Sequence, residues 1–405
     1  MTRKLLQINP VVRLNTSTGR IMKEIGEIAM AAGWESYIAY SGARDGVPQH
    51  SSQLVPVGNK LDLALHAVAT RLFDAHGLVS RRATKQLIRR IREIDPDIIH
   101  IHNVHGYWLN YPLLCQYLQE SGKPVIWTVH DCWLYTGHCY YYSAVGCSKW
   151  QTGCGHCPQK RAFPASWFLD RSARNWRDKQ RAFGSLERLT IVPVSDWIRQ
   201  EMSRSFLKDK PFQVIHNGID LEVFQPVASG AKRPAGTVIL GVATLWHEEK
   251  GVRDFIELAR RLQKGERLVL VGRMSEEQHA AFPAGVELIE RTENVAKLAA
   301  LYSQATVFVN PTWQDNYPTV NLEAIACGTP VVTYRTGGSV EAVAEGTGFV
   351  VEQGDVQGLL DRVRELAAED RQAVAARCRA HALQYFSKQE RYQDYIRLYE
   401  NLTAR

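Results

Sequence analysis

The sequence of 405 residues lacks any run of about 18 uninterrupted apolar residues, the length that a membrane-spanning helix requires. Its opening residues, MTRKLLQINP, turn polar too early for a signal peptide. No Gly-x-Gly-x-x-Gly motif follows a predicted strand, which disfavours a dinucleotide-dependent oxidoreductase. Lysine and arginine exceed aspartate and glutamate by only 49 − 42 = 7, a mild excess that permits anionic partners without requiring nucleic acid. These absences favour a cytoplasmic protein.

Apolar residues form 45% of the chain and charged residues 22%, an ordinary globular balance. Short apolar runs alternate with amphipathic stretches, a pattern typical of parallel sheets covered on both faces. The predicted strands are residues 4–9, 37–40, 97–102, 125–130, 190–194, 238–243, 267–271, 286–289, 306–310, 331–333 and 349–351. The predicted helices cover 19–31, 80–94, 251–262, 295–302, 319–326 and most of 361–404.

Residues 225–236 are rich in proline, glycine and alanine and show no periodicity. This composition predicts a linker near the middle of the chain. We therefore predict an α/β fold with two βα domains, one on each side of this linker. In open parallel sheets a ligand binds beyond the carboxyl ends of the strands. Two such sheets facing each other would form a cleft with a nucleotide on one wall and an acceptor on the other.

The most specific stretch of the sequence is VNPTWQDNYPTVNLEAIACGTPVV, residues 309–332. Pro318 suits the first turn of a helix, and Gly328 suits its end. Asp315 lies on the loop before this helix and Glu323 within it. The helix N-terminus can seat a phosphate or a sugar oxygen, and a carboxylate one turn further can accept both hydroxyls of a ribose. The alternative is a solvated loop aspartate and a glutamate on the helix surface.

This stretch resembles the signature of the retaining glycosyltransferases of family four, in which an acidic residue is followed, after seven others, by glutamate. The subgroup that it resembles occurs in bacterial exopolysaccharide, colanic acid and O-antigen biosynthesis. Asp315 stands where most of the wider family has glutamate. The resemblance covers almost the whole chain: NTSTGRI (15–21), WTVHDCW (127–133), a cysteine block, PVSDW (193–197), VIHNGID (214–220), EEKGV (248–252), RTEN (291–294) and YRTGGSVEAV (334–343).

The resemblance implies the GT-B architecture of two Rossmann-like domains whose parallel sheets face a central cleft. The acceptor-side domain would be residues 1–225, with a cysteine-rich insertion at 132–158. The nucleotide-sugar domain would be residues 226–380, and a final helix at 381–405 would cross back to the first domain.

The implied activity is transfer of a sugar from a nucleoside diphosphate, with UDP expected and GDP the alternative. The acceptor would be a hydroxyl of a glycan or of a polyprenyl-diphosphate-linked saccharide, and the anomeric configuration would be retained. In the expected front-face displacement the departing phosphate takes the acceptor proton, so Asp315 and Glu323 bind substrate and no catalytic metal is expected. A nucleotide-sugar epimerase of the same architecture and a non-catalytic nucleotide-sugar sensor are the alternatives.

Lys250 begins a predicted helix, where its ammonium could neutralise the leaving diphosphate. The family usually carries an arginine about five residues earlier, but this sequence reads ATLWH there, so Lys250 acts alone or Arg273 replaces the missing cation. The predicted catalytic residues are His130, Lys250 and Asp315. The resemblance places Gly19, Thr244, Arg273, Asn294, Asn316, Tyr317 and Glu323 on the donor side, and His102, His105 and Asp131 on the acceptor side. For His130, which ends a predicted strand, the alternative is an ordinary buried histidine.

Five of the eight cysteines fall between residues 132 and 157. Four of them match a tetrahedral structural zinc site in ligand type and number: Cys139, Cys147, Cys154 and Cys157. His138 or His156 could replace one thiolate. Four free thiols are the alternative, whereas disulfides are disfavoured in a reducing compartment. We expect a structural metal here that shapes the acceptor side.

The predicted helix at 80–94 carries a basic face opposite an apolar stripe; its cations are Arg81, Arg82, Lys85, Arg89, Arg90 and Arg92. A solvated basic face is the default interpretation. The alternative is attraction to anionic lipid at the inner face of the cytoplasmic membrane, where each cation adds about 1 kcal/mol. No nucleic-acid-binding signature accompanies this face, so we expect no nucleic acid partner.

Overall fold

The computed structural model describes residues 2–14, 16–43, 50–227 and 236–404. Asn15 of the NTSTGRI motif and residues 228–235 of the predicted linker lie outside the described residues. The chain folds as two compact units, one formed by Met1–His216 with Tyr392–Arg405 and the other by Asn217–Arg391. The sequence interpretation places the corresponding changes at residues 225 and 381.

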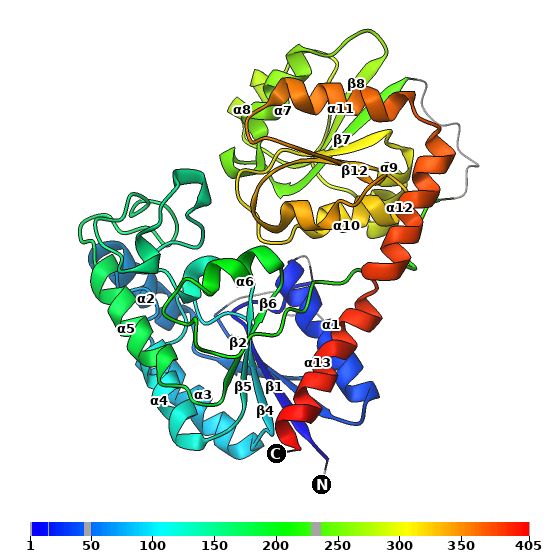
Figure 1. Cartoon of the computed structure of the whole chain (residues 1–405). Helices are drawn as coiled ribbons and strands as arrows, with labels where there is room; N and C mark the ends of the chain where they lie inside the picture. The colour runs from blue at the N-terminus through cyan, green and yellow to red at the C-terminus, as the bar shows by residue number, and fades with distance from the viewer. Residues whose placement is uncertain (1, 15, 44–49, 228–235, 405) are drawn as a thin grey trace. The chain divides into compact units, whose positions relative to one another are not determined.

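The first unit is built on a parallel sheet (Figure 1), whose strand order is β3-β2-β1-β4-β5-β6. Its strands are β1 (Lys4–Ile8), β2 (Glu35–Ser41), β3 (Gln53–Val57), β4 (Ile98–Ile101), β5 (Val125–Val129) and β6 (Leu189–Pro193). The last three are buried along their whole length, which is why they appear in the sequence as largely continuous apolar runs. The sequence interpretation missed β3, an edge strand with two exposed positions that tolerates Pro56 because an edge leaves backbone N–H groups unpaired.

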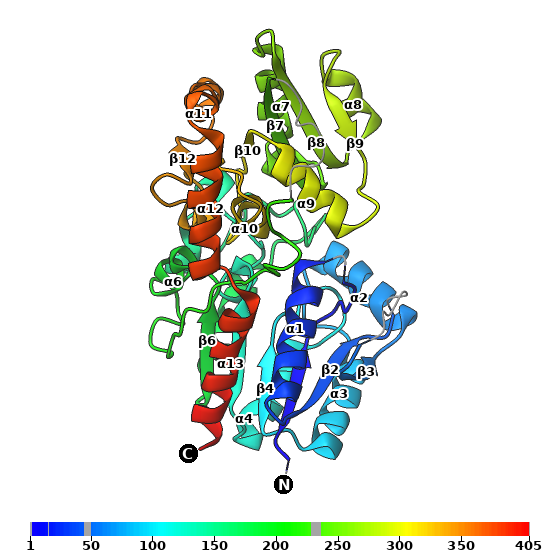
Figure 2. The ribbon, with the colours of Figure 1, turned by 90° about the vertical axis from the view of Figure 1, so that its right-hand side faces the viewer.

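The helices of the first unit are α1 (Ser17–Ala31), α2 (Lys60–Phe73), α3 (Arg81–Ile94), α4 (Tyr111–Ser121), α5 (Ser172–Gly184), α6 (Asp196–Met202) and most of α13 (Lys388–Thr403). Side-chain caps fix where several of them begin: Thr16 caps α1 and Asn110 caps α4. The final helix α13 runs beside α1 (Figure 2), where Tyr395 and Tyr399 pack with Ile25 in one buried cluster.

The second unit contains a parallel sheet in the order β12-β11-β10-β7-β8-β9. Counted from its own first strand, this is the order 3-2-1-4-5-6 of the first unit, which is the doubly wound order of nucleotide-binding sheets. Its strands are β7 (Thr237–Leu245), β8 (Glu266–Arg273), β9 (Glu287–Ile289), β10 (Val307–Asn310), β11 (Val331–Tyr334) and β12 (Gly348–Val351). Its helices are α7 (Val252–Arg260), α8 (Glu276–Ala281), α9 (Val295–Gln304), α10 (Thr319–Ala326), α11 (Val356–Ala368) and α12 (Arg371–Tyr385).

The predicted α/β fold of two Rossmann-like sheets is confirmed. Five short 3₁₀ turns lie in the connections between the described elements: η1 (Cys132–Leu134), η2 (Ser143–Val145), η3 (Lys149–Gln151), η4 (Glu248–Lys250) and η5 (Gly337–Ala342). The helical stretch predicted at 361–404 consists of three helices, because the chain leaves helical geometry after Ala368 and again after Tyr385. Within the described ranges, every helix is too short or too polar to cross a membrane.

Candidate functional site

The loop that follows β10 is fixed against η4, the turn that follows β7. The backbone N–H of Trp313 donates a hydrogen bond of 2.8 Å to the carbonyl oxygen of Glu249, and the hydroxyl of Thr312 donates one of 3.0 Å to the same oxygen. Beside these contacts Lys250 Nζ lies 2.5 Å from Asp315 Oδ2. Because β7 and β10 are neighbours in the sheet, their carboxyl ends bring together two residues that the sequence interpretation assigns to separate motifs.

Gly251 makes this close approach possible. Its φ of +76° lies in the left-handed region, and a Cβ at this position would lie 2.2 Å from the carbonyl oxygen of Pro311. No other residue type could stand between η4 and α7 without pushing the β10 loop away. The glycine of EEKGV therefore has a structural role that positions the ion pair of Lys250 and Asp315.

Glu323 lies inside α10 and is only 3% exposed. Its Oε2 accepts a hydrogen bond of 3.0 Å from the hydroxyl of Tyr302, a fully buried residue of α9. A buried carboxylate requires such partners, because desolvation without them is costly. The alternative of a solvated surface glutamate is therefore wrong for Glu323. The side chain of Asp315 is 16% exposed and pairs with Lys250.

The N-terminus of α10 follows Pro318, whose side chain makes no capping hydrogen bond. Its first-turn N–H groups and positive dipole end suit an oxygen of a phosphate or a sugar. Asn316 and Tyr317, which precede it, are both buried and form part of the loop interior.

A buried polar network that the sequence interpretation missed holds α10 in place. Asn310 Nδ2 donates to Asn321 Oδ1 at 2.8 Å, and Asn321 Nδ2 donates to the carbonyl oxygen of Ser339 at 3.1 Å. The hydroxyl of Thr333 completes the network at 2.7 Å from that of Ser339. The sequence signal for it is an asparagine at a strand end followed by a second asparagine on a helix that is otherwise apolar.

Asp254 of α7 is a second missed residue. Its carboxylate accepts hydrogen bonds of 2.7 Å from the indole of Trp313 and 2.7 Å from the hydroxyl of Tyr334. The aspartate thus ties the β10 loop to α7 and to β11. Burial raises the pKa of Tyr334, and the hydrogen bond to Asp254 raises it further, so this phenol stays protonated as a donor.

Of the other donor-side predictions, Thr244, Arg273 and Asn294 belong to the second unit and Gly19 belongs to the first. Thr244 and Arg273 are exposed at the carboxyl ends of β7 and β8, which are adjacent strands. Asn294 caps α9 by accepting a hydrogen bond of 2.8 Å from the backbone N–H of Lys297. Gly19 lies in the first turn of α1 in the first unit, where a Cβ would meet the carbonyl oxygen of Arg13 at 2.2 Å.

The predicted acceptor-side residues form a connected cluster in the first unit. His102 Nδ1 lies 3.1 Å from His130 Nε2, and His105 Nε2 lies 2.8 Å from Asp131 Oδ2. Together they line a cavity of about 10 Å³ at the carboxyl ends of β4 and β5. The hydroxyl of Tyr140 lies 2.9 Å from His105 Nδ1, which links the cluster to the cysteine-rich insertion.

Burial lowers the pKa of His130 to about 4, although the charge of Asp131 acts in the opposite direction. Burial also lowers the pKa of His102 well below its ordinary value. Both rings are therefore neutral near pH 7. His100 has a structural role, because its two ring nitrogens lie 2.7 Å from the hydroxyl of Tyr399 and 2.8 Å from that of Thr128.

The family model described as Glycosyltransferase Family 4 matches residues 19–223, and the model described as Glycosyl transferases group 1 matches residues 236–369. The structure is similar to sucrose-phosphate synthase from Thermosynechococcus elongatus, with 18% identity, a TM-score of 0.73 and 99% of each chain covered. It is also similar to Anabaena HepE, with 15% identity, a TM-score of 0.69, and 98% of this chain and 100% of that chain covered.

The sequence is 24% identical over 420 residues to WcaC of Escherichia coli K12, a glycosyl transferase named for colanic acid biosynthesis; the match covers 98% of this chain and 100% of that one. The fold and the two family models together show that this chain is a glycosyltransferase with the GT-B fold. The chain belongs to glycosyltransferase family 4.

Proposed function

We propose that this enzyme transfers a sugar from a nucleoside diphosphate sugar, with UDP as the expected carrier, to a hydroxyl of a glycan or a lipid-linked saccharide during surface polysaccharide biosynthesis. The observation that carries the proposal is the ion pair of Lys250 and Asp315, which lies on the loop that leads into the N-terminus of α10, where Pro318 supplies no side-chain cap. WcaC is named for colanic acid biosynthesis, which supports a role in surface polysaccharide biosynthesis. HepE, whose structures are described as complexes with UDP and with UDP-glucose, supports UDP as the carrier of the sugar.

The ion pair of Lys250 and Asp315 suggests how the nucleoside diphosphate sugar binds. In the absence of ligand the carboxylate of Asp315 neutralises Lys250. A diphosphate would displace Asp315 from the ammonium, and the freed carboxylate would be available to the hydroxyls of the donor sugar. Glu323, fixed by Tyr302, is proposed to hold the ribose.

The proposed reaction proceeds with retention of configuration. The bond between the anomeric carbon and the diphosphate oxygen breaks, and the acceptor oxygen bonds to that carbon on the same face. The leaving phosphate takes the acceptor proton. Lys250 stabilises the negative charge that develops on the diphosphate, a task for which a fixed cation is well suited. Neutral His130, held by His102, is proposed to orient a hydroxyl and not to donate a proton.

Ligand binding and turnover test this proposal in one sequence of experiments. A thermal-shift screen with UDP-, GDP- and dTDP-sugars should raise the melting temperature most with a UDP-sugar, because a ligand that binds only the folded state stabilises it. NMR of the product should then show the anomeric configuration of the donor. Interconversion of the donor sugar without transfer, or binding without turnover, would contradict the proposal.

An apolar face of α2 suggests where the enzyme meets a membrane surface. Leu61, Leu65 and Val68, spaced along one side of the helix, are each more than half exposed. A second exposed apolar segment, residues 167–169, is tied to the end of α2, where the backbone N–H of Trp167 donates a hydrogen bond of 2.7 Å to the carbonyl oxygen of Arg71.

The following helix, α3, buries its apolar stripe in the sheet core and exposes its cations. We propose that these two consecutive helices bind an anionic lipid surface, with the α2 face inserting and the α3 cations meeting the headgroups.

Cosedimentation tests this proposal. The enzyme should bind phosphatidylglycerol vesicles and not phosphatidylcholine vesicles, and high salt should weaken the binding. Leu61→Ser with Leu65→Ser should abolish the binding. The matched control is Leu383→Ser, on an exposed leucine of α12 in the second unit. Equal binding of all variants, or no binding at low salt, would refute the membrane role while leaving the transfer reaction untouched.

A further inference from the structure

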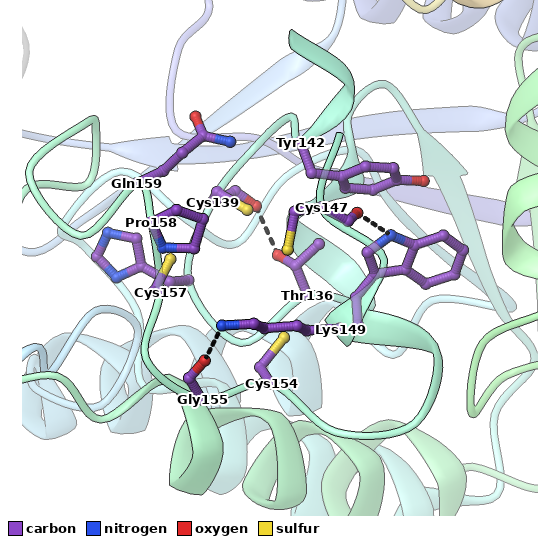
Figure 3. Close-up of a pocket in the computed structure, with 12 residues that line it drawn as sticks. Thr136, Cys139, Tyr142, Cys147, Lys149, Cys154, Gly155, Cys157, Pro158 and Gln159 are labelled. Atoms are coloured by element: carbon purple, nitrogen blue, oxygen red, sulfur yellow. Dashed lines mark hydrogen bonds between the residues drawn. The ribbon is translucent and has the colours of Figure 1, made fainter. Parts of the chain in front are cut away.

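The cysteine-rich insertion surrounds one small cavity with metal-ligating side chains. Cys139, Cys147, Cys154 and Cys157 all line it, and all are free thiols (Figure 3). The cavity has a volume of about 20 Å³, enough for a single water-sized sphere. Four sulfurs around a space of that size match the ligand type and number of a structural zinc site.

A buried histidine beside the sulfurs is an independent observation that points to a ligand. His138 lines the same cavity and is 3% exposed. Its Nδ1 lies 2.8 Å from Asp74 Oδ1, whereas its Nε2 has no hydrogen-bond partner among the described residues. A carboxylate that orients an imidazole in this way is the usual support around a zinc ion, and a buried orphan nitrogen is otherwise costly.

The surroundings fit a site of net negative charge. Zinc with four thiolates carries a charge of about −2, and the fully buried Lys179 lies close by, with its Nζ donating to the carbonyl oxygens of Trp133 at 2.5 Å and Thr136 at 2.9 Å. The backbone N–H of Gly137 donates to Cys154 Sγ at 3.2 Å. On the other side Lys149 Nζ donates to the carbonyl oxygen of Gly155 at 3.0 Å, which fixes the loop between Cys154 and Cys157.

We propose that Cys139, Cys147, Cys154 and Cys157 bind one zinc ion, with His138, oriented by Asp74, lying beside the sulfurs. Zn–S bonds of about 2.3 Å place tetrahedral sulfurs roughly 3.8 Å apart. In the structure no three of these four sulfurs lie within 4.8 Å of one another. Zinc binding must therefore draw the loop around η2 and η3 inward.

The ion would hold in place an insertion that reaches the histidine cluster. Tyr140, next to Cys139, contacts His105, and the hydroxyl of Tyr141 donates a hydrogen bond of 3.3 Å to the carbonyl oxygen of His130. In this step the inference rests on the proposed function: loss of zinc should raise the KM for the acceptor and leave UDP binding unchanged.

The zinc content of the full-length chain, purified without chelator, tests the site directly. We expect one zinc per chain, and loss of that zinc in Cys154→Ser and in Cys157→Ser. The matched control is Cys378→Ser, a buried cysteine of α12 in the second unit, which should keep the metal. His138→Ala should keep zinc with an affinity about 10–100-fold weaker.

Cobalt substitution of the wild-type chain provides a readout that needs no variant. A thiolate-to-cobalt charge-transfer band is expected. The proposal is overturned by wild-type protein that binds UDP but contains neither zinc nor cobalt, by a disulfide within the cluster in place of metal, or by zinc that persists in both serine variants. Complete loss of zinc in His138→Ala would overturn the four-cysteine ligand set. Zinc binding without sugar transfer would refute only the proposed function.

Discussion

Lys250 and Asp315, 65 residues apart in the sequence, form an ion pair with a distance of 2.5 Å between Nζ and Oδ2. The pair lies where β7 and β10, adjacent parallel strands, both end. This relationship explains how a chain that lacks the usual arginine before Lys250 can still keep a cation in position. In the proposed reaction, Asp315 holds the ammonium until a diphosphate replaces the carboxylate.

Lys250→Ala should lower kcat about 100-fold or more, because removal of one preorganised charge partner of a transition state typically costs that much. Lys250→Arg should recover part of the rate, since it restores the charge with a different shape. Steady-state kinetics with a UDP-sugar measure both effects. The control is Lys297→Ala, on an exposed lysine of α9; equal rates for Lys250→Ala and this control would refute the role of Lys250.

Tyr302→Phe should lower the free energy of unfolding by about 1–3 kcal/mol, because the buried carboxylate of Glu323 loses a hydrogen-bond donor. Glu323→Gln keeps an acceptor for Tyr302, so it should fold well but weaken donor binding. Urea unfolding and donor titration separate the two effects. A Glu323→Gln enzyme with wild-type donor affinity would remove Glu323 from the donor site.

Gly251→Ala should destabilise the second unit and misplace Asp315, since its Cβ would lie 2.2 Å from the carbonyl oxygen of Pro311. Gly285→Ala is the matched control: its φ is also positive, at +95°, but a Cβ there meets nothing within 4 Å. Backbone strain of about 1–2 kcal/mol is common to both variants. Only Gly251→Ala should also lose activity, and equal effects of the two substitutions on kcat would contradict this account.

Stability should fall as the pH is lowered from about 6.5 to about 4. Burial lowers the pKa of His66 to about 4, that of His100 to about 3 and that of His130 to about 4. In this interval the unfolded chain binds protons that the folded chain excludes, so unfolding becomes more favourable as pH falls, by about 1 kcal/mol or more for each fully buried histidine at pH 5. Urea unfolding at pH 7 and pH 5 measures the difference, and an unchanged midpoint would show that these rings are not buried in their neutral form.

The order of strands and helices could be predicted because buried parallel strands appear as short apolar runs. The elements that were not predicted are β3 and the helices α2, α4, α5, α6 and α8. Two of them have clear physical reasons: β3 is a half-exposed edge strand with a proline, and α2 exposes apolar residues that blur its amphipathic pattern. Lys250, Asp315 and Glu323 could be selected because they lie in distinctive motifs. The contacts of these three residues could not be predicted from the sequence. The ion pair depends on which strands are adjacent, and the hydrogen bond from Tyr302 to Glu323 depends on how α9 packs on α10.

The residues that sequence reasoning missed are mostly those that support others. Asp254 and Asn321 lie on helices with no motif of their own, and only the fold shows that they fix the β10 loop and α10. The sequence around Lys179 gives no sign that this lysine of α5 differs from a solvated one, but in the structure it is fully buried. Such residues are recognised by the partners that satisfy them, which lie far away in the chain.

Calorimetric titration with UDP tests the central claim most directly, because it needs neither the acceptor nor the identity of the sugar. The account predicts that wild-type enzyme and Lys297→Ala bind UDP equally well, and that Lys250→Ala binds it at least about 10-fold more weakly, a loss of about 1.4 kcal/mol. Failure of the wild-type chain to bind UDP, GDP or dTDP, or unchanged affinity in Lys250→Ala, would contradict it.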